Sequence, residues 1–263
     1  MITIKTPEEI KIMSEGGMIL ARTLRELQLI VRPGITTNEL DKLSEELLLK
    51  SGAKCAFKGY KEEGSKTAFP ACLCVSVNDE VVHYPPSGRI LEEGDIVSLD
   101  LGVLFKGFYT DMAVTVPVGK VSPAANELIE TTREALEKGI KEAKPGNHFG
   151  DIGHAIQRHV ESNGFVVVRD LCGHGIGKKL HEDPQILNYS PLGMKKGERG
   201  TGPEITEGMV FCIEPITSAG PWQIKKEGIG YKTIDNSLSA HFEHAIAVTK
   251  KGNIVLTSLR NEF

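Results

Sequence analysis

The feature of this 263-residue chain that most limits its possible folds is an internal repeat. Sliding the sequence by 112 residues places residues 33–34 on residues 145–146, a Pro-Gly pair in each case. The same slide places Gly52 on Gly164, and the apolar residues between these markers also coincide. Self-similarity of this kind indicates two copies of one structural unit, here a pair of helices.

Acidic residues repeat as well. A slide of 114 residues lays Asp100 on Glu214, and further along the chain Asp111 aligns with Glu243. Chance could explain the matching helices, but it explains the acids less well. Because no low-complexity linker divides the chain, we expect one catalytic domain in which the acids of two similar halves meet. The domain would cover 1–263, with halves of approximately 1–120 and 121–263.

Capping residues and apolar spacing predict an α/β fold with helices packed on antiparallel strands. Thr6 and Glu9 form a capping box with a proline at the first helical position, and amphipathic spacing follows. Short apolar runs between Gly, Pro and Asn predict strands. The expected helices run from Thr6 to near Arg32, Thr36 to Ser51, Ser122 to Lys144 and Phe149 to Ser162, and the expected strands cover 73–77, 96–104 and 108–116.

The charge pattern argues against two classes of partner. The net charge is −4, the pI is about 6.1, and no run of Lys or Arg exceeds two residues. We therefore expect neither a nucleic-acid substrate nor a polybasic membrane patch. No secretory h-region and no membrane-spanning apolar run is present, so we expect a cytoplasmic protein.

The cysteines predict free thiols. Five cysteines are an odd number, they lie mostly in apolar surroundings, and they form no C-x-x-C pair. We therefore expect neither a disulfide framework nor a zinc knuckle. The five are Cys55, Cys72, Cys74, Cys172 and Cys212.

Two aspartates lie in the apolar segment 98–114, which resembles a buried hairpin. If its turn is centred on residues 106–107, Asp100 faces Ala113 and Asp111 faces Gly102. Both carboxylates then lie on one face of the sheet, with Cβ atoms roughly 7–8 Å apart. This separation suits two groups that bind common cations, and Gly102 would leave room for them.

A single such aspartate could equally be an edge residue that faces water, but four acids together favour cations. Glu214 and Glu243 stand in apolar, strand-like segments, where an unpaired carboxylate would protonate or be expelled. Four carboxylates would balance two dications. Oxygen-rich sites of this kind suit Mn, Fe, Co or Mg and do not exclude zinc.

His174 lies in the segment CGHGIG, where small residues allow close approach to its ring. The segment lacks the residues of a phosphate loop, which needs Gly at Cys172 and Ser or Thr at Lys179, and its G-x-G-x-G spacing is not the dinucleotide pattern. His174 remains either a structural loop histidine or a fifth metal ligand that makes two metals unequal.

These residues resemble, in order and context, the five metal ligands of methionine aminopeptidases. The similarity extends over essentially the whole chain and includes the segments around His83 and His181. It implies the pita-bread fold and, because no zinc-binding extension or long insertion is present, the short bacterial-style type I form. It also implies two divalent ions per chain, drawn from Co, Mn, Fe, Zn or Ni.

The resemblance assigns roles to the ligands. Asp100 would bind one metal, His174 and Glu214 the other, and Asp111 and Glu243 would span the pair. Glu214 would also carry a proton from the attacking water to the leaving amine. The implied reaction removes the N-terminal methionine of nascent proteins when the second residue is small.

The resemblance further implies substrate contacts. His181 would stabilise the oxyanion, and His83 would contact the substrate backbone. The methionine pocket would be lined by Tyr60, Cys74, Leu180 and Trp222, an apolar set that suits a thioether. Leu180 stands where the family commonly has an aromatic residue, and the loop 61–72 is longer than usual. As partners we expect nascent N-termini, with the ribosome left open, for a monomeric enzyme.

Two other functions fit parts of the pattern. Proline-specific aminopeptidases and prolidases share the fold and ligands, but they usually carry a large N-terminal domain that is missing here. Non-catalytic pita-bread binding modules keep the shape and lose ligands, whereas all five stand in this chain. Hydrolysis of Met-Ala-Ser against Xaa-Pro-Xaa peptides distinguishes these alternatives.

Overall fold

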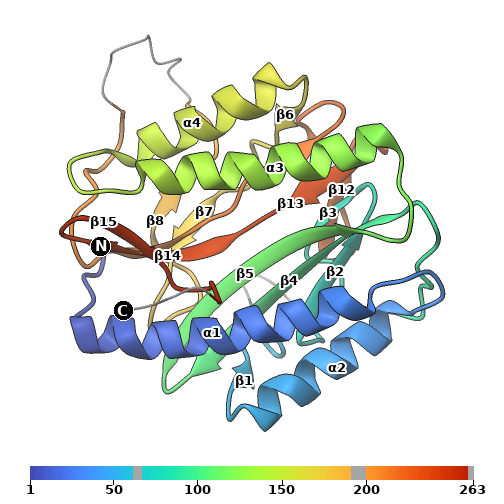
Figure 1. Ribbon diagram of the computed structural model, residues 1–263, viewed down its shortest axis with the longest axis horizontal. Coiled ribbons are helices and arrows are strands. Elements are labelled where there is room, and N and C mark those ends of the chain that lie inside the picture. Colours follow the sequence, from blue (N-terminus) through green and yellow to red (C-terminus); the bar gives the residue numbers. More distant parts are fainter. Residues whose placement is uncertain (62–66, 191–199, 260–263) are drawn as a thin grey trace.

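The computed structural model describes residues 1–61, 67–190 and 200–259, and it confirms a mixed α/β fold. Helices α1 and α2 lie along one half of the strands and α3 and α4 along the other half, and all four contribute to the same apolar cluster (Figure 1). All four expected helices are present, each ending within about two residues of its predicted limit. Their bounds are Pro7–Ile30, Thr37–Lys50, Pro123–Glu142 and Phe149–Ser162.

The capping box at the start of α1 is confirmed. The hydroxyl of Thr6 accepts a hydrogen bond from the N–H of Glu9, and the Glu9 carboxylate accepts one from the N–H of Thr6 at 3.0 Å. Two otherwise unpaired backbone donors are thereby satisfied. Thr36 and Glu39 cap α2 in the same way.

The long hairpin of the first half has the predicted register. Strand β4 (Ile96–Phe105) pairs with β5 (Phe108–Pro117), so that Asp100 faces Ala113 and Gly102 faces Asp111. On the other edge of β4 lie β1 (Lys54–Cys55) and β2 (Leu73–Val77), arranged end to end. β2 and the hairpin confirm the three predicted strands.

The second half contains many short strands, of which the sequence pattern indicated only β9 and β14, in the strand-like segments around Glu214 and Glu243. Five of its strands form a sheet in the order β15, β14, β9, β7, β8. Two further sheets of three strands have the orders β13, β10, β6 and β11, β12, β3. The bounds are β3 Glu80–Val82, β6 Val166–Val167, β7 Gly173–Gly175, β8 Glu182–Ile186, β9 Val210–Ile213, β10 Ile216–Ser218, β11 Ile224–Glu227, β12 Gly230–Thr233, β13 Ser239–His241, β14 His244–Thr249 and β15 Gly252–Val255.

The two halves meet through hydrogen bonds next to the acids. The N–H of Glu243 donates to the carbonyl of Ala113 at 2.9 Å. The Thr115 hydroxyl donates to the carbonyl of His241 and accepts from the N–H of the same residue. These contacts place β5 against the turn between β13 and β14. Among the described residues, no helix is long and apolar enough to cross a membrane.

The expectation of five free thiols is wrong for one pair. Cys55 and Cys72 form a disulfide with a Cα–Cα distance of 5.1 Å, within the usual range for such bonds. They meet because β1 and β2 follow one another along the same edge of β4, a proximity that their 17-residue separation in sequence does not reveal. The other three cysteines are free.

Candidate metal centre

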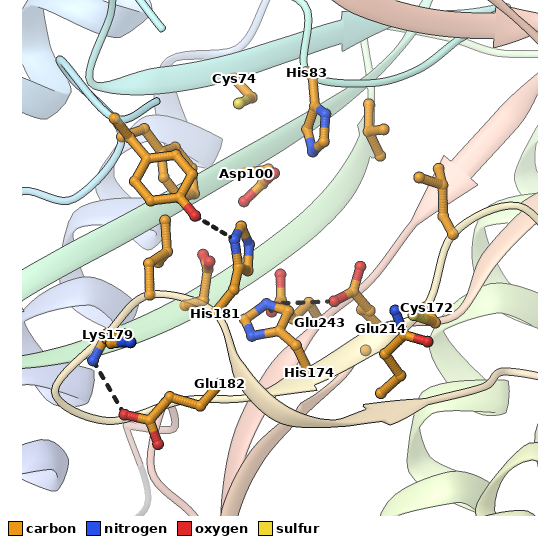
Figure 2. A pocket seen from close by; sticks show the side chains of 18 of the residues that line it. Cys74, His83, Asp100, Cys172, His174, Lys179, His181, Glu182, Glu214 and Glu243 are labelled. Atoms are coloured by element: carbon orange, nitrogen blue, oxygen red, sulfur yellow. Dashed lines mark hydrogen bonds and ion pairs between the residues drawn. The ribbon is translucent and has the colours of Figure 1, made fainter. Parts of the chain in front are cut away.

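Three of the predicted acids converge in one buried cluster. The hairpin supplies Asp100 from β4 and Asp111 from β5, and the break between β13 and β14 supplies Glu243. Oxygen atoms of all three carboxylates lie within 4.8 Å of one another. Figure 2 shows Asp100 and Glu243 pointing into the same cavity. The register of the β4–β5 hairpin confirms the prediction that Asp100 and Asp111 lie on the same face of the sheet.

His174 faces the remaining acid from β7. Its Nε2 lies 3.6 Å from Oε1 of Glu214 and 4.0 Å from Oε1 of Glu243. Its Nδ1 lies 3.0 Å from the carbonyl oxygen of Gly175, which assigns the proton to Nδ1 and leaves the Nε2 lone pair directed at the carboxylates. Burial lowers the pKa of His174 to about 3, so the ring is neutral and able to bind a cation.

Burial also changes the pKa values of the four carboxylates. It raises the pKa of Asp111 to about 7. Burial, together with the negative charge of neighbouring acids, raises the pKa values of Asp100, Glu214 and Glu243 well above the usual range. Without cations, this cluster would retain protons near neutral pH, because several adjacent anions in a buried site repel one another.

Unsatisfied polar atoms indicate that the cluster fits cations. Oδ1 of Asp100 and Oε1 of Glu243 are buried and have no hydrogen-bond partner among the described residues, and the same holds for Nε2 of His241. Buried polar atoms are rarely left in this state, and an ion is one of the standard explanations. Carboxylate oxygens with one imidazole nitrogen suit a range of divalent metals.

Two further residues of the cluster were not predicted. Nε2 of His241 lies 3.9 Å from Oε2 of Glu214. The sulfur of Cys212 lies within 4.8 Å of ligand atoms of both His174 and Glu243. Each stands two residues before one of the predicted acids, and the period of two in a strand could have identified both.

A cleft of about 1640 Å³ opens beside the cluster. Most of the predicted substrate residues line it, namely Tyr60, Cys74, His83, Leu180 and His181. The hydroxyl of Tyr60 lies 2.8 Å from Nδ1 of His181. The rings of His181 and His174 meet edge to face at 4.4 Å.

Trp222 is not among the residues that line this cleft. Its ring instead lies 5.6 Å from the guanidinium carbon of Arg169, which also lies 5.6 Å from the ring of Tyr189. The resemblance alone placed Trp222 at the pocket, and no local pattern supported that placement.

Gly102 has a different role from the one predicted. A Cβ at this position would lie 2.6 Å from Cε1 of Phe57 and 2.8 Å from Cβ of Ala56. The missing side chain therefore makes room for the Phe57 ring and not for cations. Phe57 and Phe69 line the cleft although the sequence did not predict it. The part of the longer loop at residues 62–66 lies outside the described residues.

The chain is similar to known proteins in both sequence and structure. The sequence matches metallopeptidase family M24 over residues 11–250. The chain is 45% identical over 259 residues to methionine aminopeptidase 1 of Bacillus subtilis, covering 98% of this chain and 99% of that protein. It is also similar to the crystal structure of methionine aminopeptidase from Thermotoga maritima, with a TM-score of 0.90, 45% identity and coverage of 98% and 100%.

The chain therefore belongs to metallopeptidase family M24 and, within it, to the methionine aminopeptidases, which confirms the predicted pita-bread fold. The prolidase of Pyrococcus furiosus is also similar, with a TM-score of 0.75 and 24% identity, and this similarity concerns the fold alone. The match covers 98% of this chain but 66% of that prolidase.

Proposed function

We propose that this chain hydrolyses the first peptide bond of polypeptides that begin with methionine and have a small second residue. The observation that carries the proposal is the buried cluster of Asp100, Asp111 and Glu243 beside a cleft, in a chain that matches methionine aminopeptidases over 98% of its length. Nascent N-termini are the corresponding substrates.

The proposal includes two divalent ions per chain. Asp100 would hold one, His174 and Glu214 the other, and Asp111 and Glu243 both. When bound, such ions lower the pKa of a coordinated water and polarise the scissile carbonyl. The donor set accepts Co, Mn, Fe, Zn or Ni, so availability decides which is used.

The chain's own side chains would move protons and hold the substrate. Glu214, whose carboxylate borders the cleft, would take a proton from the attacking water and deliver it to the leaving amine. If Nδ1 of His181 accepts the Tyr60 hydroxyl proton, Nε2 carries hydrogen and can donate to the oxyanion. His83 lines the same cleft and would contact the substrate backbone.

The pocket for the first side chain would be formed by Tyr60, Cys74 and Leu180. Cys74 and Leu180 are buried in the same apolar cluster, with Tyr60 packed against it. A flexible thioether fits a small apolar cavity of this kind. Trp222 does not line the cleft and lies beside Arg169, so we leave it out of the proposed pocket.

We propose one catalytic domain that covers 1–263. A single buried apolar cluster contains residues from both halves, such as Leu24 and Leu99 from the first and Ile156 and Ile246 from the second, which supports this arrangement. A cytoplasmic monomer that meets nascent chains at the ribosome is part of the same proposal.

The test compares two peptides with the metal-loaded enzyme. With Mn²⁺ or Co²⁺ added, the chain should release methionine from Met-Ala-Ser and leave Ala-Pro-Ser intact. Hydrolysis of Ala-Pro-Ser without hydrolysis of Met-Ala-Ser would replace the proposal with a proline-specific activity. Failure on both peptides under all metals would indicate a non-catalytic protein.

A further inference from the structure

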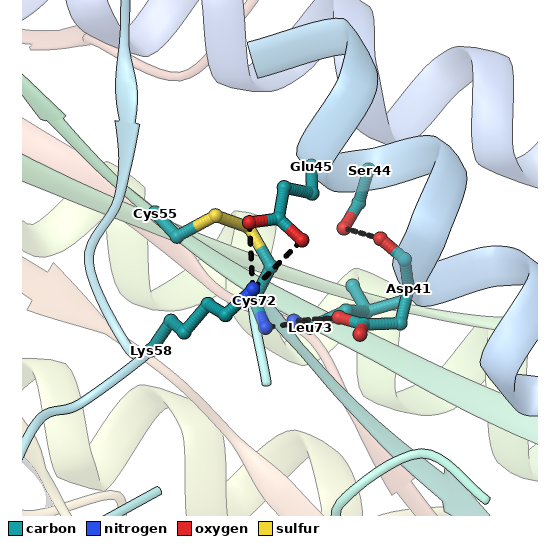
Figure 3. The surroundings of a disulfide bond; sticks show 7 residues. All are labelled: Asp41, Ser44, Glu45, Cys55, Lys58, Cys72 and Leu73. Carbon is teal, nitrogen blue, oxygen red and sulfur yellow. Dashed lines mark hydrogen bonds and ion pairs between the residues drawn. A yellow bond between two sulfur atoms is a disulfide. The ribbon is translucent and has the colours of Figure 1, made fainter. Parts of the chain in front are cut away.

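The Cys55–Cys72 disulfide closes the base of a segment that forms one wall of the cleft. Cys55 faces Val103 and Leu73 faces Leu101 on the same edge of β4, so the chain leaves and rejoins the sheet opposite Gly102. We call residues 55–61 and 67–72 the wall segment. Figure 3 shows the disulfide at its base, next to α2.

Side chains of the wall segment reach the cleft. Phe57, Tyr60 and Phe69 all line it. The two arms of the segment are paired, because the N–H of Gly59 donates to the carbonyl of Phe69 and the N–H of Phe69 donates to the carbonyl of Tyr60, both at 2.8 Å. A shift at the base of the segment would therefore move these rings together.

The two ends of the segment are held unequally. Cys72 is fully buried, and Oδ1 of Asp41 on α2 accepts hydrogen bonds from the N–H groups of Cys72 and Leu73, each at 2.9 Å. Cys55 is partly exposed and ends a strand of only two residues. The Cys72 end is thus held by buried contacts without the disulfide. Without it, the Cys55 end would keep the two residue pairs of β1, the hydrogen bond from the N–H of Ala56 to the carbonyl of Gly102 at 3.0 Å, and the solvent-exposed ion pair of Lys58 with Glu45, so it is the more weakly held end.

We propose that Cys55–Cys72 is an exchangeable disulfide, reduced by low-molecular-weight thiols, whose state sets the affinity of the cleft for the first side chain of the substrate. This inference rests on the proposed function. In the cytoplasmic location proposed above, glutathione keeps most thiols reduced, and the disulfides found there are usually redox-active.

The exchange balances with a thiol as the only co-reactant. A small thiolate attacks the sulfur of Cys55, which is the more exposed partner, and the S–S bond breaks with Cys72 leaving as a thiolate that takes a proton. A second small thiolate attacks the small-molecule sulfur of the mixed disulfide and releases the Cys55 thiolate. Two electrons pass to the protein, and two small thiols become one disulfide.

Reduction should act on binding more than on chemistry. A wall that is already fixed in its binding position lowers the entropic cost of substrate binding, and part of this advantage is lost when the Cys55 end loses its disulfide. The predicted metal ligands lie on β4, β5 and β7 and between strands of the second half, and none belongs to the wall segment. We therefore expect a higher KM and, because Tyr60 of the wall segment contacts His181, a smaller fall in kcat.

The experiment compares oxidised and reduced wild-type protein. Glutathione disulfide prepares one state and a phosphine reductant the other. Alkylation after denaturation should label three cysteines in the oxidised protein and five in the reduced one. For Met-Ala-Ser with Mn²⁺, we expect reduction to raise KM about fivefold, and the Kd for free methionine by calorimetry to rise similarly.

Cys55→Ser provides the control, because it keeps the fully buried Cys72 in place. It should match the reduced protein in both redox conditions. If it fails to fold, the Cys55→Ala/Cys72→Ala variant replaces it. Equal KM and equal Kd in the two wild-type states would overturn the inference, as would a reductant effect that persists in the control. A difference in methionine Kd without hydrolysis in either state would support the inference and contradict the proposed function.

Discussion

Replacing Lys5 with methionine should destabilise the loop that carries His181. Nζ of Lys5 donates to Oε2 of Glu182 at 2.8 Å, and the two side chains are only 5% and 9% exposed. Glu182 also accepts hydrogen bonds from the Thr3 hydroxyl at 2.6 Å and from the N–H of Lys179 at 3.1 Å. Lys5 thus connects the N-terminal segment to the residue that follows His181 (Figure 2 shows the Lys179 contact).

The size of the expected loss in stability follows from the burial of the Lys5–Glu182 pair. Removing one partner of a buried ion pair typically costs about 3–5 kcal/mol, because a charge is left buried without compensation. Glu182 would keep Thr3 and Lys179 as donors, and methionine would fill the space of the lysine stem, so we expect the lower end, about 3 kcal/mol. For a chain of this size, that is a fall in Tm of about 6–12 °C.

Thermal unfolding at pH 7 measures this loss, with Lys11→Met as the matched control. Lys11 is exposed on α1, and its replacement should change stability by less than about 0.5 kcal/mol. Lys5→Met/Glu182→Gln should recover most of the loss, because it removes the uncompensated charge. A loss below about 1 kcal/mol for Lys5→Met would refute the reasoning, since that is the range of a solvated surface pair.

The pH dependence gives a second check on the same pair. Burial alone would raise the pKa of Glu182, but hydrogen bonds from Lys5, Thr3 and Lys179 outweigh it and place the pKa below its usual value. A carboxylate with a lowered folded-state pKa contributes stability above its unfolded pKa and loses it as the pH falls through the folded pKa. The difference between wild type and Lys5→Met should therefore be constant from pH 6 to 8 and shrink below about pH 4.

Three further predictions concern the cleft and the metal cluster. Glu214→Ala should lower kcat at least about 100-fold with an unchanged circular dichroism spectrum, and activity within tenfold of wild type would exclude the proton-shuttle role. Because Ile2 is not small, mass spectrometry of the native protein should find Met1 retained, and a mature chain that starts at Ile2 would contradict the specificity. Since burial raises the pKa of Asp111 to about 7 and those of the other three acids well above their usual range, Mn²⁺ should bind at least about tenfold more weakly at pH 6 than at pH 8 and should release protons on binding. A pH-independent Kd by calorimetry would be inconsistent with a protonated cluster.

The sequence predicted the elements that local rules determine. The caps at Thr6 and Thr36 specify helix starts, and both capping boxes are present. Strand parity placed Asp100 and Asp111 on one face because the turn fixes the register of a two-stranded hairpin. The repeat then related these residues to Glu214 and Glu243 without any knowledge of the tertiary structure.

The missed features depend on contacts between distant segments. The disulfide follows from β1 and β2 sharing one edge of β4, which no spacing of cysteines encodes. Strands of the second half, such as β8, are short and carry polar residues and a proline, so they lack the alternation that marks a strand. Trp222 was placed at the pocket by resemblance alone, and the structure places it beside Arg169.

The most direct test of the central claim is an anomalous difference map from crystals of this protein grown with Mn²⁺. We expect two peaks about 3.5–4 Å apart, the spacing of catalytic two-metal sites. One peak should contact Asp100, the other His174 and Glu214, and both should contact Asp111 and Glu243. Strong peaks elsewhere, or none within ligand distance of these residues at saturating Mn²⁺, would contradict the account.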